Sequence, residues 1–248
     1  MLRRRYSTAL AVAVLSVFGA AFASAATFAP SAVELDAMGF HRHDAEQFVQ
    51  SLPEPQVDAT GRAYYAFDDM RYAADAAQTD AAFIGRTWPG GVLYYQFEAG
   101  INTTRRQQWR DAAAVWSQVA PVTFVESTGN GNYVRVMAST GNSSYVGMLA
   151  SGAQAMEIAS WNSKFIIAHE IGHALGLIHE QSRRDRDSYV RILLNNVVSG
   201  ERHNFDIENT SVPYGAYDFD SVMHYGRNDF SSNGGNTIEP LPAYSSYL

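Results

Sequence analysis

One eleven-residue stretch constrains this chain more than any other feature: "HEIGHALGLIH", from His169 to His179. It follows the order H-E-x-x-H-x-x-G-x-x-H and contains three of the seven histidines in the 248-residue sequence. A match to five fixed positions is far more specific than a bare H-E-x-x-H, which recurs by chance. The fold must therefore bring these side chains together.

The histidine spacing predicts a metal site. Residues four apart lie on one face of a helix, so His169 and His173 project side by side. Gly176 can adopt the left-handed conformation that ends a helix, which lets His179 return to the same point. Three neutral imidazoles with an open fourth position are typical of a catalytic zinc, and the absence of cysteine excludes a thiolate-rich structural site. We expect one Zn²⁺ per chain.

Glu170 follows the first of these ligands and is the candidate general base. Zinc lowers the pKa of its bound water to roughly 7, and a carboxylate beside that water can take its proton and pass it to a leaving amine. The competing interpretation is that the three histidines form the polar surface of a helix end. The presence of both Glu170 and Gly176 argues against it.

Strand and helix patterns lead up to the motif. Segments 92–98, 122–126, 133–138 and 152–160 are typical of strands, the last of them exposed. A helix is predicted after a capping Asn102 or Thr103, and the motif helix should begin near Asn162 or Ser163. The apolar face of the first helix consists of Trp109, Ala112, Ala113, Trp116 and Val119.

The first 80 residues differ from the rest. An arginine cluster, a short apolar run and Ala23-Ser24-Ala25 predict a signal peptide over residues 1–25, with an N-terminal membrane anchor as the alternative. Residues 26–80 carry ten acidic side chains against three arginines, which is typical of a propeptide or of a flexible extension. Residues 81–248 then form the main domain.

Charge and hydropathy limit the partners. The net charge is −7, and no cluster of basic residues lies beyond the extreme N-terminus, so we expect no nucleic-acid partner. No later segment is long and apolar enough to cross a membrane, so we expect no stable membrane association. A secreted or periplasmic monomer is expected.

Further motifs carry a family resemblance. Downstream lies "YDFDSVMHYG" (217–226), which supplies the methionine turn that follows the third histidine in metzincins. Together with "HEIGHALGLIHEQSRRDRDSYV", "RTWPGGVLYYQF" (86–97) and "YVGMLASGAQ" (145–154), it makes the chain resemble the astacin family of zinc endopeptidases over most of residues 81–248. The resemblance implies an α+β, metzincin-like catalytic domain. It would have a twisted, mostly antiparallel-edged sheet, two long helices above a cleft, and an irregular C-terminal half that is short here.

The resemblance also implies roles for three residues after the histidines. Glu180 would anchor the new N-terminus of the mature enzyme, and Met223 would form the hydrophobic base under the zinc. Tyr225 would be an additional zinc ligand that swings away to stabilise the oxyanion, a role suited to a phenolic donor. On spacing alone, Met223 is a core residue and Tyr225 a buried tyrosine.

Two more expectations rest on the resemblance. Gly152, Ala153 and Gln154 would belong to the upper rim of the cleft, where a peptide substrate lies by strand addition; a plain edge strand is the alternative. In the propeptide, "FDDM" is a degenerate form of an F-x-G-D motif that lacks the glycine. Asp69, or else Asp68, would occupy the zinc and keep the enzyme latent; a solvated acidic pair is the alternative.

The chain departs from the family in two respects. It has no cysteine, with Asn142 and Trp161 where one disulfide would fall, and it ends at Leu248, soon after the methionine turn. We expect a secreted, zinc-dependent endopeptidase that acts on proteins or peptides and is made as a zymogen. The alternative, favoured only by the short C-terminus, is a catalytically impaired homologue that binds proteins or peptides.

Overall fold

The computed structural model describes residues 54–74, 86–127, 129–209 and 211–247. The expected signal peptide and the expected boundary at residues 80 and 81 lie outside the described residues. No helix in the described ranges is both long and apolar enough to span a membrane.

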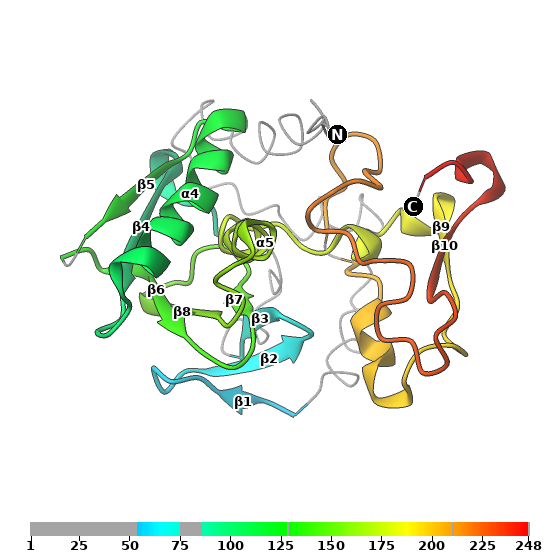
Figure 1. The fold of residues 1–248 in the computed structure, drawn as a ribbon, viewed down its shortest axis with the longest axis horizontal. Coiled ribbons are helices and arrows are strands. Elements are labelled where there is room, and N and C mark those ends of the chain that lie inside the picture. Colours follow the sequence, from blue (N-terminus) through cyan, green and yellow to red (C-terminus); the bar gives the residue numbers. More distant parts are fainter. Residues whose placement is uncertain (1–53, 75–85, 128, 210, 248) are drawn as a thin grey trace, which may run out of the picture.

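A mixed eight-stranded sheet forms one side of the molecule (Figure 1). Its strand order is β1-β2-β3-β7-β8-β6-β4-β5. β5, β4, β6 and β8 run parallel to one another, whereas β7 is antiparallel to β8. The strands are β1 (Gln56–Val57), β2 (Ala63–Phe67), β3 (Met70–Ala73), β4 (Val92–Phe97), β5 (Thr123–Glu126), β6 (Asn132–Ala138), β7 (Ser143–Tyr145) and β8 (Gly152–Ile158). With its two helices, this sheet confirms the α+β class.

Two helices cover one face of the sheet. α4 (Thr103–Val119) begins after Asn102, whose side chain accepts a hydrogen bond from the Arg105 amide, and α5 (Lys164–Ala174) begins after Ser163. Both N-caps agree with the sequence prediction. The indole Nε1 of Trp116 on α4 donates to the carbonyl of Ala168 on α5 at 2.9 Å. The shared apolar core therefore fixes the motif helix against α4 and the sheet. Figure 1 shows α5 beside α4, next to the sheet.

The expectation of an exposed rim strand at Gly152, Ala153 and Gln154 is wrong. β8 lies inside the sheet, paired along its whole length with β6 and near its end with β7. Gln154 is buried, and its side chain binds the Leu149 amide and the Gly147 carbonyl. The chain reverses between β7 and β8, which places β7 outside β8.

Residues 54–74 of the acidic N-terminal segment are folded, although the sequence predicted no strand there. β1, β2 and β3 form an antiparallel meander, and β3 continues the sheet by pairing parallel with β7. Tyr64 and Ala73 from this meander pack with Tyr145 and Ala155 in a second core. This core lies on the opposite face from the helices, because Ala155 alternates along β8 with Met156 of the first core.

The C-terminal part has little regular structure but a core of its own. Its strands β9 (Val190–Ile192) and β10 (Ile238–Pro240) pair antiparallel. It also contains the 3₁₀ helices η4 (Glu180–Ser182), η5 (Arg186–Ser188), η6 (Ser199–Phe205) and η7 (Pro242–Tyr244). The remaining 3₁₀ helix in the described part of the chain, η3 (Pro89–Gly91), lies just before β4. A mainly aromatic cluster, which includes Phe205, Tyr217, Phe219 and Tyr225, fills the interior. Figure 1 shows this part, coloured yellow to red, on the far side of α5 from the sheet.

Candidate metal centre

The three motif histidines converge on one point. His169 and His173 project from α5, and His179 follows the turn at Gly176, whose φ of 104° is the predicted left-handed value. The Nε2 atom of His169 lies 3.0 Å from that of His173 and 3.3 Å from that of His179. Asp69 joins them, and the ligand atoms of all four residues lie within 4.8 Å of one another.

Backbone carbonyls orient two of the rings. Nδ1 of His169 is 2.7 Å from the carbonyl oxygen of Val222, and Nδ1 of His173 is 2.8 Å from that of Leu177. A carbonyl oxygen only accepts hydrogen bonds, so each Nδ1 is the donor and each neutral ring turns the lone pair of Nε2 toward the centre. Because α5 ends before Leu177 and Val222 lies in the methionine turn, these two segments fix the site.

Burial keeps the inner histidines neutral. His173 and His179 have no exposed surface, and burial lowers the pKa of both, that of His179 to about 4. Burial also opposes charge on His169, but hydrogen bonding to Asp69 outweighs it and raises the pKa of His169. Three lone pairs this close repel one another unless a cation lies between them, and imidazole nitrogens with a carboxylate suit zinc. The donor set therefore fits the zinc ion expected from the sequence.

Glu170 is a buried carboxyl beside this centre. It has no exposed surface, and neither carboxyl oxygen has a hydrogen-bond partner among the described residues. Burial raises its pKa well above the ordinary value, and the charges of Asp69 and Asp68 raise it further. An unpaired carboxyl held at a metal centre is available for proton transfer.

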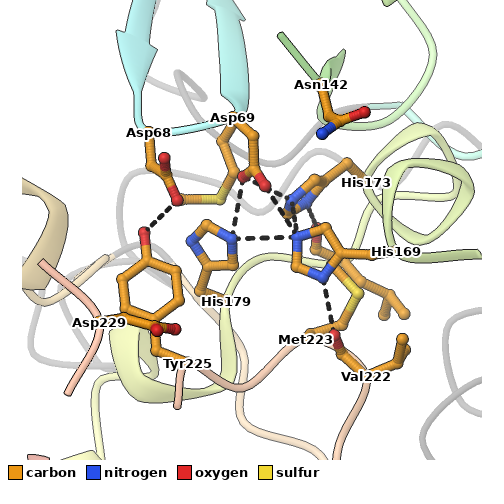
Figure 2. Close-up of polar contacts among 12 residues, drawn as sticks. Asp68, Asp69, Asn142, His169, His173, His179, Val222, Met223, Tyr225 and Asp229 are labelled. Atoms are coloured by element: carbon orange, nitrogen blue, oxygen red, sulfur yellow. Dashed lines mark hydrogen bonds and ion pairs between the residues drawn. The ribbon is translucent and has the colours of Figure 1, made fainter. Parts of the chain in front are cut away.

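Both carboxylates of "FDDM" engage the site, where the sequence left a choice between them. Figure 2 shows Asp68 and Asp69 at the tip of the β2–β3 hairpin, facing the histidines and Tyr225. Asp69 lies 3.0 to 3.2 Å from the three Nε2 atoms, whereas Asp68 accepts a 2.8 Å hydrogen bond from the Tyr225 hydroxyl. Asp68 has a φ of 56°, so the tip of the hairpin needs a residue in the left-handed conformation that glycine adopts most readily. Aspartate tolerates this conformation better than most residues.

The methionine turn packs beneath the ligands. Met223 is buried, and its Sδ lies against the backbone of Gly172 on α5, where a β-carbon would be only 2.7 Å away. Tyr225 is buried beside His179, with ring centroids 4.5 Å apart. Burial, reinforced by Asp68 and Asp69, raises the pKa of its hydroxyl, which keeps the proton that it donates to Asp68.

Glu180 lies on the far side of the third histidine. Its Oε1 accepts from Arg183 Nη1 at 2.8 Å and from the Asp218 amide at 2.9 Å. The mature N-terminus that it was expected to bind lies outside the described residues.

Some contacts at the site were missed from the sequence. The partners of Asp68 and Gln181 are examples, since the Gln181 side-chain oxygen accepts from the Tyr225 amide at 3.1 Å. The doubled aspartate was the only signal of the first contact, and no pattern indicated the second.

The sequence is similar to those of known peptidases. The family model for astacin, a family of peptidases, matches residues 80–246. Tolloid-like protein 2 of Mus musculus is 36% identical over 195 residues, covering 77% of this chain and 19% of that protein. Zinc metalloproteinase nas-14 of Caenorhabditis elegans is 39% identical over 165 residues, covering 62% of this chain and 32% of that protein. The chain thus spans about a fifth to a third of the length of these relatives.

The chain is also similar to solved structures. High choriolytic enzyme 1, a hatching enzyme zinc-protease from the medaka fish Oryzias latipes, aligns with a TM-score of 0.58 and 31% identity. The alignment covers 66% of this chain and 84% of that one.

Proposed function

Because the chain belongs to the astacin family, we propose that it is a zinc-dependent endopeptidase that hydrolyses peptide bonds in proteins and is exported as a latent precursor. The observation that carries the proposal is the convergence of three Nε2 lone pairs beside a buried, unpaired carboxyl. His169, His173 and His179 would hold the zinc ion, and Tyr225 would be an additional ligand that swings away to stabilise the oxyanion. A zinc ion there polarises the substrate carbonyl and lowers the pKa of water.

The other side chains at the site have separate roles in the proposed reaction. Glu170 takes the proton from the attacking water and passes it to the leaving amine. The Tyr225 hydroxyl donates a hydrogen bond to the developing oxyanion. Met223 supports the ligands from below by packing on α5. Burial of these groups excludes water, which strengthens each charge interaction.

Latency is proposed to come from the β2–β3 hairpin. Asp69 occupies the position next to the metal ligands that a substrate carbonyl needs, and Asp68 holds the Tyr225 hydroxyl. Removal of residues 26–80 would free both groups together. Glu180 would then bind the new amino terminus through Oε2, because its hydrogen bonds to Arg183 and Asp218 use Oε1.

Export rests on the sequence of residues 1–25, and we propose a secreted or periplasmic monomer whose partners are protein or peptide substrates. The function is tested by incubating the purified mature form with a denatured protein. Cleavage should stop with a zinc chelator and return with added zinc. A zinc-loaded mature form that binds but does not cleave the protein would favour the binding homologue instead.

The latch has its own test. Asp69→Ala should give a full-length precursor with premature activity, because Asp69 is the hairpin residue whose carboxylate lies 3.0 to 3.2 Å from all three histidines. Peptide cleavage is measured while mass spectrometry verifies an intact chain, and Asp68→Ala serves as the matched variant. If Asp68→Ala activates while Asp69→Ala stays silent, Asp68 is the latch. If neither activates, the hairpin blocks the site by bulk alone.

A further inference from the structure

The propeptide strand β3 occupies a sheet edge that the catalytic domain offers to any extended peptide. The Ser144 amide donates to the Asp69 carbonyl at 2.9 Å, and the Val146 amide donates to the Arg71 carbonyl at 3.1 Å. These contacts are the main-chain pairs by which an extended peptide adds a strand to a sheet. Once residues 26–80 leave, the same edge of β7 is open to substrate.

One side chain of β3 forms an ion pair with the catalytic domain. Arg71 is paired in register with Tyr145, so both side chains project to the face away from α4 and α5. There Arg71 is 6% exposed, and its Nη2 lies 2.8 Å from Glu157 Oε2. Glu157 belongs to β8, the strand beyond β7, and is paired with the small residue Ser143. Its carboxylate thus reaches across β7 to the bound strand.

Glu157 is held by groups that stay when the propeptide leaves. The Ser139 hydroxyl, just after β6, donates to Glu157 Oε2 at 3.1 Å. The other close partner of the Arg71 guanidinium is the Tyr64 ring, 4.5 Å away, which belongs to the propeptide and departs with it. The mature enzyme therefore keeps a positioned carboxylate without the cation that it pairs with in the precursor.

We propose that Glu157 is a specificity-determining residue that selects an arginine or lysine side chain in the substrate, at the position paired with Tyr145. The inference rests on the proposed peptidase function. Arg71 lies two residues after Asp69, whose carboxylate is at the metal centre, so the selected residue lies close to the scissile bond. Charge-assisted hydrogen bonds are about twice as strong as neutral ones, and one shielded from solvent gives about ten-fold selectivity or more.

The test compares peptides of one sequence that carry either arginine or citrulline, its neutral isostere, at each position from three before to three after the scissile bond. The mature form should show a kcat/KM at least about ten-fold higher for arginine at one of these positions. In Glu157→Gln that ratio should fall to about one. The matched control is Glu126→Gln, on β5 at the other edge of the sheet, where Glu126 also pairs with an arginine, Arg110. Its ratio should stay at the wild-type value.

The possible results distinguish failure of the Glu157 proposal from failure of the proposed peptidase function. Zinc-dependent cleavage of arginine and citrulline peptides at equal rates would leave the peptidase standing and overturn the role of Glu157. The role of Glu157 is also overturned if the arginine preference survives in Glu157→Gln, or if that change only weakens latency of the precursor. The wild-type ratio decides the question even if Glu157→Gln fails to fold. Failure to cleave any peptide would overturn both proposals.

Discussion

At the scale of single residues, the site contains two kinds of carboxyl with opposite environments. The three histidine rings that surround Asp69 hold its pKa far below the ordinary value despite burial, so it is an anion beside them. Burial raises the pKa of Glu170, and the negative charges of the hairpin add to this rise. Two carboxyls whose environments separate their pKa values are suited to different roles.

Glu170→Ala should separate proton transfer from metal binding. Because Glu170 does not share in the cluster of four metal-binding side chains, the variant should retain one zinc per chain while kcat falls on the order of 10²-fold or more. His173→Ala should lose the metal as well as the activity. Metal analysis and peptide kinetics on both variants check this, and an alanine variant with undiminished kcat would rule out Glu170 as the base.

At the scale of elements, α5 is held between α4 and the methionine turn. Both neighbours lie close to Gly172, since a β-carbon there would meet Met223 Sδ at 2.7 Å and Trp116 Cζ2 on α4 at 3.1 Å. Both side chains are nearly fully buried. Because Gly172 has no side chain, Met223 and Trp116 pack directly against the backbone of α5, and these contacts position the helix that carries His169 and His173.

Gly172→Ala should destabilise the protein. Alanine gains about 1 kcal/mol in helix propensity over glycine, but forcing a methyl group into a filled core costs about 1–3 kcal/mol and displaces Met223. Chemical denaturation should show a net loss, accompanied by weaker zinc binding. The control is Gly200→Ala in η6, where a β-carbon meets nothing within 4 Å, and its stability should change little. Equal stability of the two variants would show that Met223 moves aside freely.

The hairpin should release at acid pH. Burial tends to raise the pKa of Asp58, but hydrogen bonds from Thr60, Arg62 and Tyr145 outweigh it and hold the pKa below the ordinary 3.8. The pKa of Asp58 is thus lower in the folded than in the unfolded protein. Its contribution to the stability of the folded state is therefore complete above pH 3.8 and is lost as pH falls through the folded pKa.

Hydrogen exchange of residues 54–74 in the precursor should therefore accelerate as pH falls below about 4, once corrected for the intrinsic pH dependence of exchange. Asp58→Asn, which cannot titrate, should remove much of this acid-dependent change. An unchanged profile in Asp58→Asn would assign the acid sensitivity to another group.

At the scale of the whole molecule, the metal centre joins two separate cores. One is the first core, between the sheet and the two helices, and the other is the mainly aromatic cluster that fills the C-terminal part. His169 and His173 come from the first part, whereas Met223 and Tyr225 come from the second. The chain contains no cysteine, so no disulfide reinforces this junction. Where a disulfide would fall, Asn142 instead hydrogen-bonds to the amides of Ala159 and Ser160.

Zinc should therefore contribute strongly to the stability of the mature protein. A ligand that binds only the folded state at 1,000 times its Kd adds about 4 kcal/mol, a large share of the roughly 5–15 kcal/mol typical of a domain. Thermal melting of the mature form with and without chelator measures this, and chelation should lower the Tm markedly. A high Tm that chelation leaves unchanged would show that the two cores hold together without the metal.

The sequence by itself determined what depends on spacing along the chain. Helical periodicity placed the apolar face of α4, capping residues marked the starts of both helices, and H-E-x-x-H-x-x-G-x-x-H brought three histidines together because helix geometry is local. Only the tertiary structure decided which strands are neighbours. β8 has the pattern of a strand, but its place inside the sheet depends on β7 folding back beside it, and the folding of residues 56–73 depends on the edge that β7 then offers.

The contact of Asp68 with Tyr225 spans 157 positions of the sequence, and the contact of Arg71 with Glu157 spans 86 positions. Such pairs form only when the chain closes long loops, and the free energy of that closure comes from packing across the whole molecule, which no short stretch of sequence records.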